Sequence, residues 1–352
     1  MTDAQIVEKL KDEGKQVLIY GNANHAGLVY EYLRDRGVEA ANFVVDDQYY
    51  TAGMTLKNKP VLAIGQCDIE NSNIVLGFCN VEKTKFIMNN KQIVKGNYYL
   101  LWEPLSIYEW DEEYLSVNRA KFDEIENDLA DEMSKKILRT LMKAKVNCEA
   151  DEMLLLADDT QYFNELTYQI DPREEILCDC GAFNGDTVRK FYQFTNGNYK
   201  KIYAFEPNNE NLAALKKNTQ GVQNLVLVNK GTWNEDTTLS FSMDGSASLI
   251  DDAGEVKIDV TAIDNVVGDD KVTFIKMDVE GSEMESLIGA AKTIAKNMPK
   301  LAICCYHKTN DIIGFYDYIK TFENAEKKYN FYLRHHSNSV YETVLYAIPV
   351  AK

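Results

Sequence analysis

One stretch of the chain, residues 175–191, constrains its fold most: an apolar run breaks into a glycine turn and resumes with helical spacing. The run carries Asp179, the turn extends from Gly181 to Gly185, and apolar residues return from Val188 onward. A strand, a glycine turn and a helix in this order predict the first βα corner of a dinucleotide-type α/β fold. Glycines let a ligand approach the backbone, and free N–H groups at the helix start face its anionic end.

The next strand narrows the choice of ligand. An apolar run at residues 201–205 ends in Glu206 and Pro207, where such folds bind ribose hydroxyls with a carboxylate. Phe183 stands where a dinucleotide fingerprint needs its second glycine against a pyrophosphate. A ligand without a pyrophosphate fits better, and S-adenosylmethionine is such a ligand. A purely structural tight turn is the alternative interpretation of the glycines.

Length and charge limit the class of protein. A chain of 352 residues can form two domains that each bury a core, and 45% apolar with 26% charged residues is typical of a globular protein. The formal net charge of −17 repels phosphate backbones, and the basic residues are scattered, so we expect no nucleic-acid substrate. A neutral or cationic small molecule is easier to accommodate.

The N-terminal residues lack a basic region followed by an apolar core, and no apolar run approaches the ~20 residues of a membrane span. We therefore expect a cytoplasmic protein without membrane partners. Seven cysteines in a long chain without a secretion signal indicate free thiols rather than a disulfide framework.

Residues 1–105 predict a smaller Rossmann-like α/β domain. A strand at residues 16–20 leads into a second glycine corner from Gly21 to Gly27, a strand near residues 43–45 ends in Asp46, and apolar runs follow at 73–78 and 85–88. Two interpretations stay open: a nucleotide pocket at Gly21 and Gly27 with Asp46 as ribose ligand, or, favoured here, a domain used for docking. Apolar residues at helical spacing predict a helical connector over residues 106–172.

Polar residues end the later strands of the second α/β domain, residues 173–352. The buried run at 274–277 leads into Asp278 and Glu280, and His307 and His335 end two further apolar runs. Ligands of open α/β sheets lie beyond the carboxyl ends of the strands, so Asp278, His307 and His335 are expected to converge on one substrate pocket. A structural salt bridge is the alternative for Asp278. Ser282 with Glu285 further predicts a capping box for the next helix.

Four motifs in order resemble the FkbM-type S-adenosylmethionine-dependent methyltransferases, over about residues 159–351. They are Asp-Cys-Gly-Ala-Phe-Asn-Gly-Asp-Thr at 179–187, Phe-Glu-Pro-Asn at 205–208, Lys-Met-Asp-Val-Glu-Gly at 276–281 and Glu-Thr-Val-Leu-Tyr-Ala at 342–347. The resemblance implies a class I methyltransferase fold: a seven-stranded, mostly parallel sheet with its last strand antiparallel and helices on both faces. It also implies transfer to a hydroxyl of a sugar or secondary metabolite.

By matching position, the resemblance implies a set of cofactor-binding residues. Asp179, Gly181, Gly185 and Asp186 would hold the methionine end, Glu206 the ribose, and Gly231, Thr232 and Trp233 the adenine side, with Phe183, Thr187, Pro207 and Asp278 also at the cofactor. Methyl transfer is an in-line displacement in which positioning supplies much of the rate. His307 is the first candidate for the base that removes the hydroxyl proton and His335 the second, with Asp278 orienting the acceptor or the base.

Other functions stay open at this point. Asp278 and Glu280 could supply part of a magnesium site, but a further oxygen ligand is not evident, so we expect no metal. An NAD- or nucleotide-dependent enzyme centred on the N-terminal glycine corner is one alternative, and a non-catalytic S-adenosylmethionine-binding protein is another. A homo-oligomer is compatible with all three.

Overall fold

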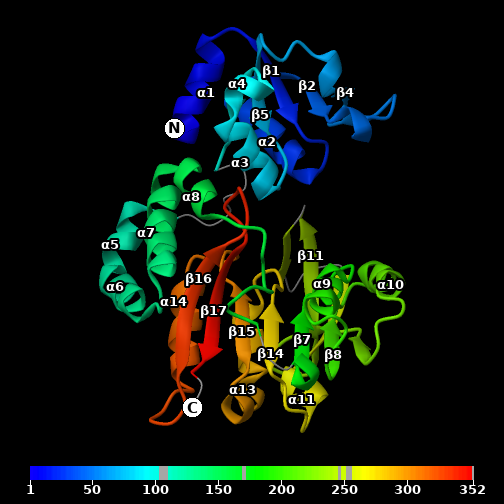
Figure 1. The fold of residues 1–352 in the computed structure, drawn as a ribbon, viewed down its shortest axis with the longest axis vertical. Helices are drawn as coiled ribbons and strands as arrows, with labels where there is room; N and C mark the ends of the chain where they lie inside the picture. Colours follow the sequence, from blue (N-terminus) through cyan, green and yellow to red (C-terminus); the bar gives the residue numbers. More distant parts are fainter. Residues whose placement is uncertain (103–109, 169–171, 245–246, 251–255, 351–352) are drawn as a thin grey trace. The chain divides into compact units, whose positions relative to one another are not determined.

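The computed structural model describes residues 1–102, 110–168, 172–244, 247–250 and 256–350, and the chain forms two compact units (Figure 1). The first unit contains residues 1–120, 133–159 and 334–343, and the second contains residues 121–132, 160–333 and 344–352. This division differs from the expected one at 1–105, 106–172 and 173–352. The expected first boundary lies outside the described residues, and the helical stretch is shared between the units instead of forming a connector.

The first unit contains a sheet with the strand order β3-β4-β2-β1-β5-β6. Its strands are β1 (Gln16–Tyr20), β2 (Ala40–Val45), β3 (Thr55–Leu56), β4 (Lys59–Ala63), β5 (Ser72–Leu76) and β6 (Asn97–Tyr99). Its helices include α1 (Asp3–Asp12), α2 (Asn24–Asp35), α3 (Val81–Asn89), α4 (Lys91–Val94), α5 (Glu112–Val117), α7 (Glu132–Asn147) and α8 (Asp151–Leu156). Only β3 pairs antiparallel, so the expected Rossmann-like sheet is present. The apolar run at 85–88 lies in α3.

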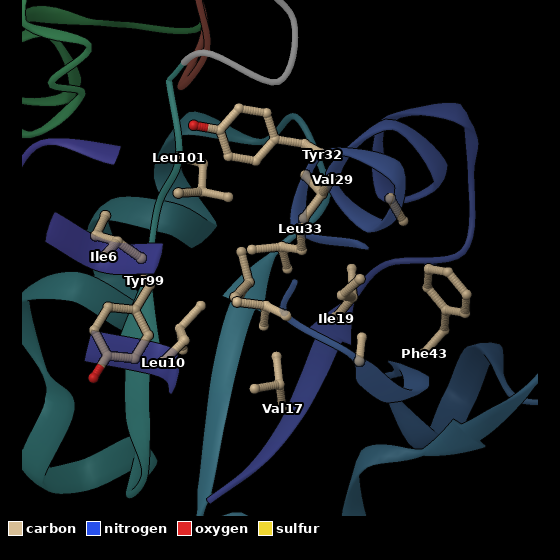
Figure 2. Packing of buried hydrophobic residues seen from close by; sticks show 14 of the residues in the cluster. Ile6, Leu10, Val17, Ile19, Val29, Tyr32, Leu33, Phe43, Tyr99 and Leu101 are labelled. Carbon is tan, nitrogen blue, oxygen red and sulfur yellow. The ribbon is translucent and has the colours of Figure 1, made fainter. Parts of the chain in front are cut away.

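Apolar residues of two helices cover the sheet of the first unit, as Figure 2 shows. Ile6 and Leu10 of α1 and Leu33 of α2 are buried in one apolar cluster with Ile19 of β1. Helix α1 begins with a capping box, in which the Thr2 hydroxyl accepts from the Gln5 N–H and the Gln5 side chain accepts from the Thr2 N–H. The helix therefore starts at a defined residue and presents its apolar positions on one side.

The loop between the last two strands of the chain belongs to the first unit. Asn338 is 1% exposed, and its amide donates to the carbonyl of Phe78 at 2.9 Å and to the Thr84 hydroxyl at 3.1 Å. Ser337 and Ser339 are also buried, with their hydroxyl oxygens 2.8 Å apart. The first unit therefore includes a segment far along the chain from its sheet.

The second unit contains a seven-stranded sheet with the order β16-β17-β15-β14-β7-β8-β9. The strands are β7 (Ile176–Cys180), β8 (Lys201–Phe205), β9 (Leu225–Val228), β14 (Phe274–Met277), β15 (Lys300–Cys304), β16 (Tyr329–His335) and β17 (Thr343–Pro349). Strand β17 runs antiparallel to β15, whereas the β15-β14-β7-β8-β9 pairs are parallel. The predicted class I sheet with an antiparallel last strand is confirmed.

Helices flank this sheet (Figure 1), and a smaller sheet has the order β10-β13-β11-β12. The further elements are α6 (Arg119–Asp128), α9 (Asp186–Phe194), α10 (Asn209–Asn218), α11 (Ile263–Val267), α12 (Glu283–Ile288), α13 (Ala291–Asn297), α14 (Asp311–Lys320), β10 (Gly231–Thr232), β11 (Thr237–Asp244), β12 (Ala247–Ile250) and β13 (Val256–Thr261). Within the described ranges, no helix combines the length and the apolar character needed to cross a membrane.

We expect Asn338→Ala to lower the free energy of unfolding of the first unit by about 1–3 kcal/mol, because it leaves the Phe78 carbonyl and the Thr84 hydroxyl without a buried donor. Urea unfolding measures this change. Asn71→Ala is the matched control, because Asn71 is exposed and donates to Asp68 at 2.9 Å, and it should change stability by less than about 0.5 kcal/mol. Equal effects of the two variants would contradict the packing of this loop.

Candidate active site

A buried ion pair joins the two central strands of the second unit. Lys276 of β14 lies opposite Asp179 of β7 in the parallel register, with its Nζ 3.1 Å from Asp179 Oδ1. Their side chains are 2% and 0% exposed. Lys276 Nζ also donates to the carbonyls of Gly181 at 2.8 Å and Cys180 at 3.2 Å. The lysine thus holds both a carboxylate and the start of the glycine turn.

Burial and charge act in opposite directions on this pair. Burial raises the pKa of Asp179 to about 6, although the Lys276 charge lowers it in part. Burial also acts to lower the pKa of Lys276, but the carboxylates of Asp179 and Asp278 raise it above its usual value. Lys276 therefore stays charged at neutral pH, and its charge favours the ionised form of both acids.

The glycine turn is shaped by close backbone contacts. Gly181 has φ +81°, and a Cβ atom there would lie 1.9 Å from the carbonyl oxygen of Asp278. Gly185 has φ +85°, and its Cβ would lie 2.7 Å from Leu215 Cδ1. Phe183 between them adopts φ +44° and is 54% exposed. Any side chain at Gly181 would separate the turn from the end of β14, so the turn and Asp278 form one site.

The Glu206 carboxylate anchors the turn from the end of β8. Its Oε2 accepts from the Phe183 N–H at 2.9 Å, and its Oε1 accepts from the Asn208 N–H at 2.9 Å. Glu206 is 5% exposed, and this burial raises its pKa despite the backbone donors. Each carboxylate oxygen retains further acceptor capacity, so the anchoring is compatible with binding of ribose hydroxyls.

The remaining residues expected at the cofactor follow the same edge of the sheet. Asp186 is the exposed first residue of α9, and Thr187 beside it is buried. Pro207 lies against Gly231, whose Cβ would be 3.7 Å from Pro207 Cγ. The Thr232 hydroxyl is buried 2.6 Å from the Ser286 hydroxyl, whereas Trp233 is half-buried. Trp233 is therefore better placed than Thr232 to face the adenine ring of a bound cofactor.

Two tyrosines hold the Asp278 side chain. Tyr162 donates to Oδ2 at 3.1 Å and Tyr306 donates to Oδ1 at 3.1 Å. The Asp278 side chain is 26% exposed, so it reaches the surface between these rings. Burial acts to raise the pKa of Asp278, but Lys276, His307 and the two hydroxyls lower it below its usual value. Asp278 is therefore an ionised acceptor at the edge of the sheet.

His307 lies among carboxylates. Its Nδ1 is 2.9 Å from Glu283 Oε1, and its Nε2 is 3.7 Å from Asp278 Oδ1 and 3.6 Å from Glu280 Oε2. The Glu283 contact is an ion pair without the angles of a hydrogen bond. Burial acts to lower the pKa of His307, but the three carboxylates raise it to about 9. The imidazole therefore carries a proton at neutral pH, and it must lose that proton before it can act as a base.

In the loop after β14, Glu283 makes the backbone contact, and the expected pair of Ser282 and Glu285 does not. The Ser282 side chain makes no cap hydrogen bond, so the predicted capping box with Glu285 is wrong. Glu285 instead accepts from Asn234, while Glu283 Oε1 accepts from the Val279 N–H at 2.8 Å. This places the 1% exposed Glu283 carboxylate against Nδ1 of the His307 ring.

The candidate base His335 lies in residues 334–343, which belong to the first unit, whereas Asp278 and His307 belong to the second. The His335 side chain is 0% exposed, and its Nδ1 lies 2.9 Å from the Thr343 hydroxyl. Its ring is 6.0 Å from the Trp102 ring, and burial lowers its pKa to about 3. His335 is therefore a neutral, enclosed side chain.

Three side chains of the site have the donor types of a cation site. Asp278, Glu283 and His307 each offer one ligand atom, and these atoms lie within 4.8 Å of one another. The sequence showed Asp278 and Glu280 but no further ligand, because His307 and Glu283 meet only in the fold. A protonated His307 already supplies positive charge at this place, so the expectation of no metal stays a prediction.

The N-terminal glycine corner is explained by packing. A Cβ at Gly21 would lie 2.2 Å from the carbonyl oxygen of Gly77. Asp46, the candidate ribose ligand, accepts from Tyr20 and forms an ion pair with Lys83, each at 2.5 Å. Close contact of two strand ends therefore accounts for Gly21, and Asp46 already has partners.

Three residues of the site were missed from sequence: Lys276, Tyr306 and Glu283. Lys276 had a signal, since it interrupts a buried apolar run. Glu283 follows a motif that was recognised, but two acids stand close together there and the wrong one was chosen. Tyr306 had no comparable signal, and Tyr162 reaches the site from a segment that precedes β7.

Comparison with known proteins gives one family match, which lies mostly within the second unit. Residues 179–334 match the family model of the methyltransferase FkbM domain, a range that contains the glycine turn, Glu206, Asp278 and His307. The chain is also similar to the crystal structure of methyltransferase FkbM from Methylobacillus flagellatus KT, with a TM-score of 0.69 and 22% identity over 98% of this chain and 94% of that chain. At this identity the similarity shows the fold alone.

Shorter matches cover about half of the chain. An rRNA methylase from Streptococcus thermophilus has 17% identity and a TM-score of 0.32 over 57% of this chain and 93% of that one. A Streptococcus mutans protein in complex with SAH has 14% identity and a TM-score of 0.33 over 56% and 94%. Neither adds evidence for the fold at these TM-scores. No curated protein matches the chain.

We expect the imidazole of His307 to titrate near pH 9, whereas His335 and His25 stay neutral above about pH 5. With four histidines in the chain, ¹⁵N-imidazole NMR can resolve each ring, with His307→Gln as the assignment control. Glu283→Gln should lower the His307 pKa, because it removes the nearest negative charge while a side-chain oxygen stays available to the Val279 N–H. Titration of His307 near ~6.5, the value of a free imidazole, would contradict this charge arrangement.

Proposed function

We propose that the protein transfers a methyl group from S-adenosylmethionine to a hydroxyl of a sugar or secondary metabolite, because residues 179–334 match the family model of the methyltransferase FkbM domain. One observation carries this proposal: the glycine turn packs directly against Asp278, so a cofactor on the turn lies beside the Asp278 and His307 side chains. A methyl donor on the turn and a hydroxyl acceptor beside Asp278 would then lie next to each other. Alignment of the two is the main requirement of an in-line methyl transfer.

Each part of the cofactor has a matching group at the sheet edge. The turn from Gly181 to Gly185 offers backbone N–H groups to the methionine carboxylate, with Asp186 nearby. Glu206 at the end of β8 accepts ribose hydroxyls, and Trp233 offers a half-buried ring to the adenine. The buried acids of the site favour the positively charged sulfonium.

His307 is the proposed base. Glu283 lies at Nδ1 and directs the other nitrogen, Nε2, toward the gap between Asp278 and Glu280. An acceptor hydroxyl in that gap donates its proton to Nε2 as the oxygen attacks the methyl carbon, and Asp278 orients the hydroxyl. We assign this role to His307 and not to His335, because the His335 ring is fully enclosed in the first unit.

The two alternatives from sequence have less support. The N-terminal corner has a packing explanation for Gly21 and existing partners for Asp46. A non-catalytic S-adenosylmethionine-binding protein would share the cofactor site but would not need the buried carboxylates around His307. Formation of S-adenosylhomocysteine with a panel of hydroxyl acceptors, followed by mass spectrometry, separates binding from turnover.

We expect S-adenosylmethionine to bind the intact chain, and Glu206→Gln to weaken binding by about 1–3 kcal/mol, because the substitution removes a charged acceptor for ribose hydroxyls and for the turn. Isothermal titration calorimetry measures this change. The control is Glu210→Gln, since Glu210 lies on the exposed first turn of α10, and it should bind as the wild type does. Absence of binding by the wild type would exclude the proposed function.

With an accepted hydroxyl substrate, kcat/KM should rise about tenfold per pH unit and level off near pH 9, because only the neutral form of His307 accepts a proton. Glu283→Gln should move the plateau to lower pH, because it lowers the pKa of the base. Initial rates of S-adenosylhomocysteine formation between pH 6 and 10 test this. A profile that levels off near pH 6 would exclude His307 as the base.

A further inference from the structure

Tyr162 reaches the active site from outside the FkbM domain. It precedes the matched range, residues 179–334, and it belongs to the second unit. Its side chain is 3% exposed, and its hydroxyl lies 3.1 Å from Asp278 Oδ2 and 3.2 Å from Cys304 Sγ. The hydroxyl therefore contacts the acid that faces the proposed acceptor.

The ring of Tyr162 covers the buried ion pair. Lys276 Nζ lies 5.4 Å from the ring centroid, within the range of a cation–π interaction. The same Nζ pairs with Asp179 and donates to the Gly181 carbonyl. One aromatic side chain thus contacts both the lysine beneath the cofactor turn and the acid on the acceptor side.

The backbone holds this ring in a fixed place. Tyr162 adopts φ +67°, a left-handed conformation that is unfavourable for a bulky side chain. Its N–H donates to the Tyr346 hydroxyl at 3.0 Å, and its carbonyl accepts from the Thr167 hydroxyl at 2.8 Å. Such conformations persist where the surroundings determine them, and they gather at functional sites.

We propose that Tyr162 is a positioning residue of the methyltransferase site, which fixes the Asp278 carboxylate through its hydroxyl and shields the Lys276–Asp179 pair with its ring. The catalytic role of Tyr162 rests on the proposed function, whereas the effect of its hydroxyl on the Asp278 carboxylate does not. The active site then requires residues 160–167, which precede the recognised domain.

The effect of Tyr162 on Asp278 can be separated from that of the other groups. Asp278 also faces Lys276 of β14, Cys304 of β15, Tyr306 and His307 after β15, and Glu280 of its own loop, with Asp179 beyond Lys276. Among the residues that the structure describes, the two tyrosines are the hydroxyl donors to the Asp278 carboxylate. Removal of one such donor disfavours the ionised carboxylate, because that form loses a hydrogen bond.

The test is ¹³C-carboxyl NMR of the full chain without cofactor, with Asp278→Asn assigning the resonance. We expect Tyr162→Phe to raise the Asp278 pKa by about one unit, while Tyr168→Phe, an exposed ring of the same segment, leaves it unchanged. With cofactor and an accepted substrate, Tyr162→Phe should lower kcat about tenfold and leave S-adenosylmethionine affinity within about twofold. An unchanged Asp278 titration would overturn the proposal.

A second replacement covers the case in which Tyr162→Phe does not fold. 3-Fluorotyrosine at position 162 keeps the shape of the ring and is a stronger donor, so it should lower the Asp278 pKa, and no shift would overturn the proposal. Thermal unfolding shows whether each variant folds. Failure of the wild type to bind S-adenosylmethionine would exclude the proposed function alone, because the titration of Asp278 needs no cofactor.

Discussion

The buried pair of Lys276 and Asp179 is the interaction on which the active site depends. Two charges at 2% and 0% exposure are costly to desolvate, and removal of one partner from such a pair typically costs about 3–5 kcal/mol. The cost is offset because the lysine also donates to the carbonyls of Cys180 and Gly181. The pair thereby connects the two central strands and sets the direction of the glycine turn. Glu206 fixes the turn from the other side.

The fold of the second unit could be predicted from sequence because its signals are local. Several strands end in a polar residue, and the glycine turn separates an apolar run from residues with helical spacing. The contact between Gly181 and Asp278 also follows, since adjacent parallel strands end at one edge. The charge state of His307 did not follow, because it depends on three carboxylates from a loop whose path has no local signature.

Site residues whose surroundings depend on contacts between distant parts of the chain could not be predicted from sequence. His335 ends an apolar run as His307 does, but the chain leaves the second unit at that point, so the two residues have different surroundings. Tyr162 lies in a stretch without periodicity and reaches Asp278 across 116 positions of sequence. In the first unit, Gly21 matched a ligand-binding pattern, whereas the nearby Gly77 carbonyl explains it. A glycine alone does not distinguish close approach of a ligand from close approach of a strand.

The order of segments in the two units bears on how the chain folds during translation. Domains usually fold one after the other as they leave the ribosome, starting at the N-terminus. Here the first unit needs residues 334–343, which are made after most of the second unit. Its β-sheet can form early, but the groups that Asn338 satisfies wait until the last two strands emerge. The first unit of a nascent chain is therefore incomplete until residues 334–343 have been made.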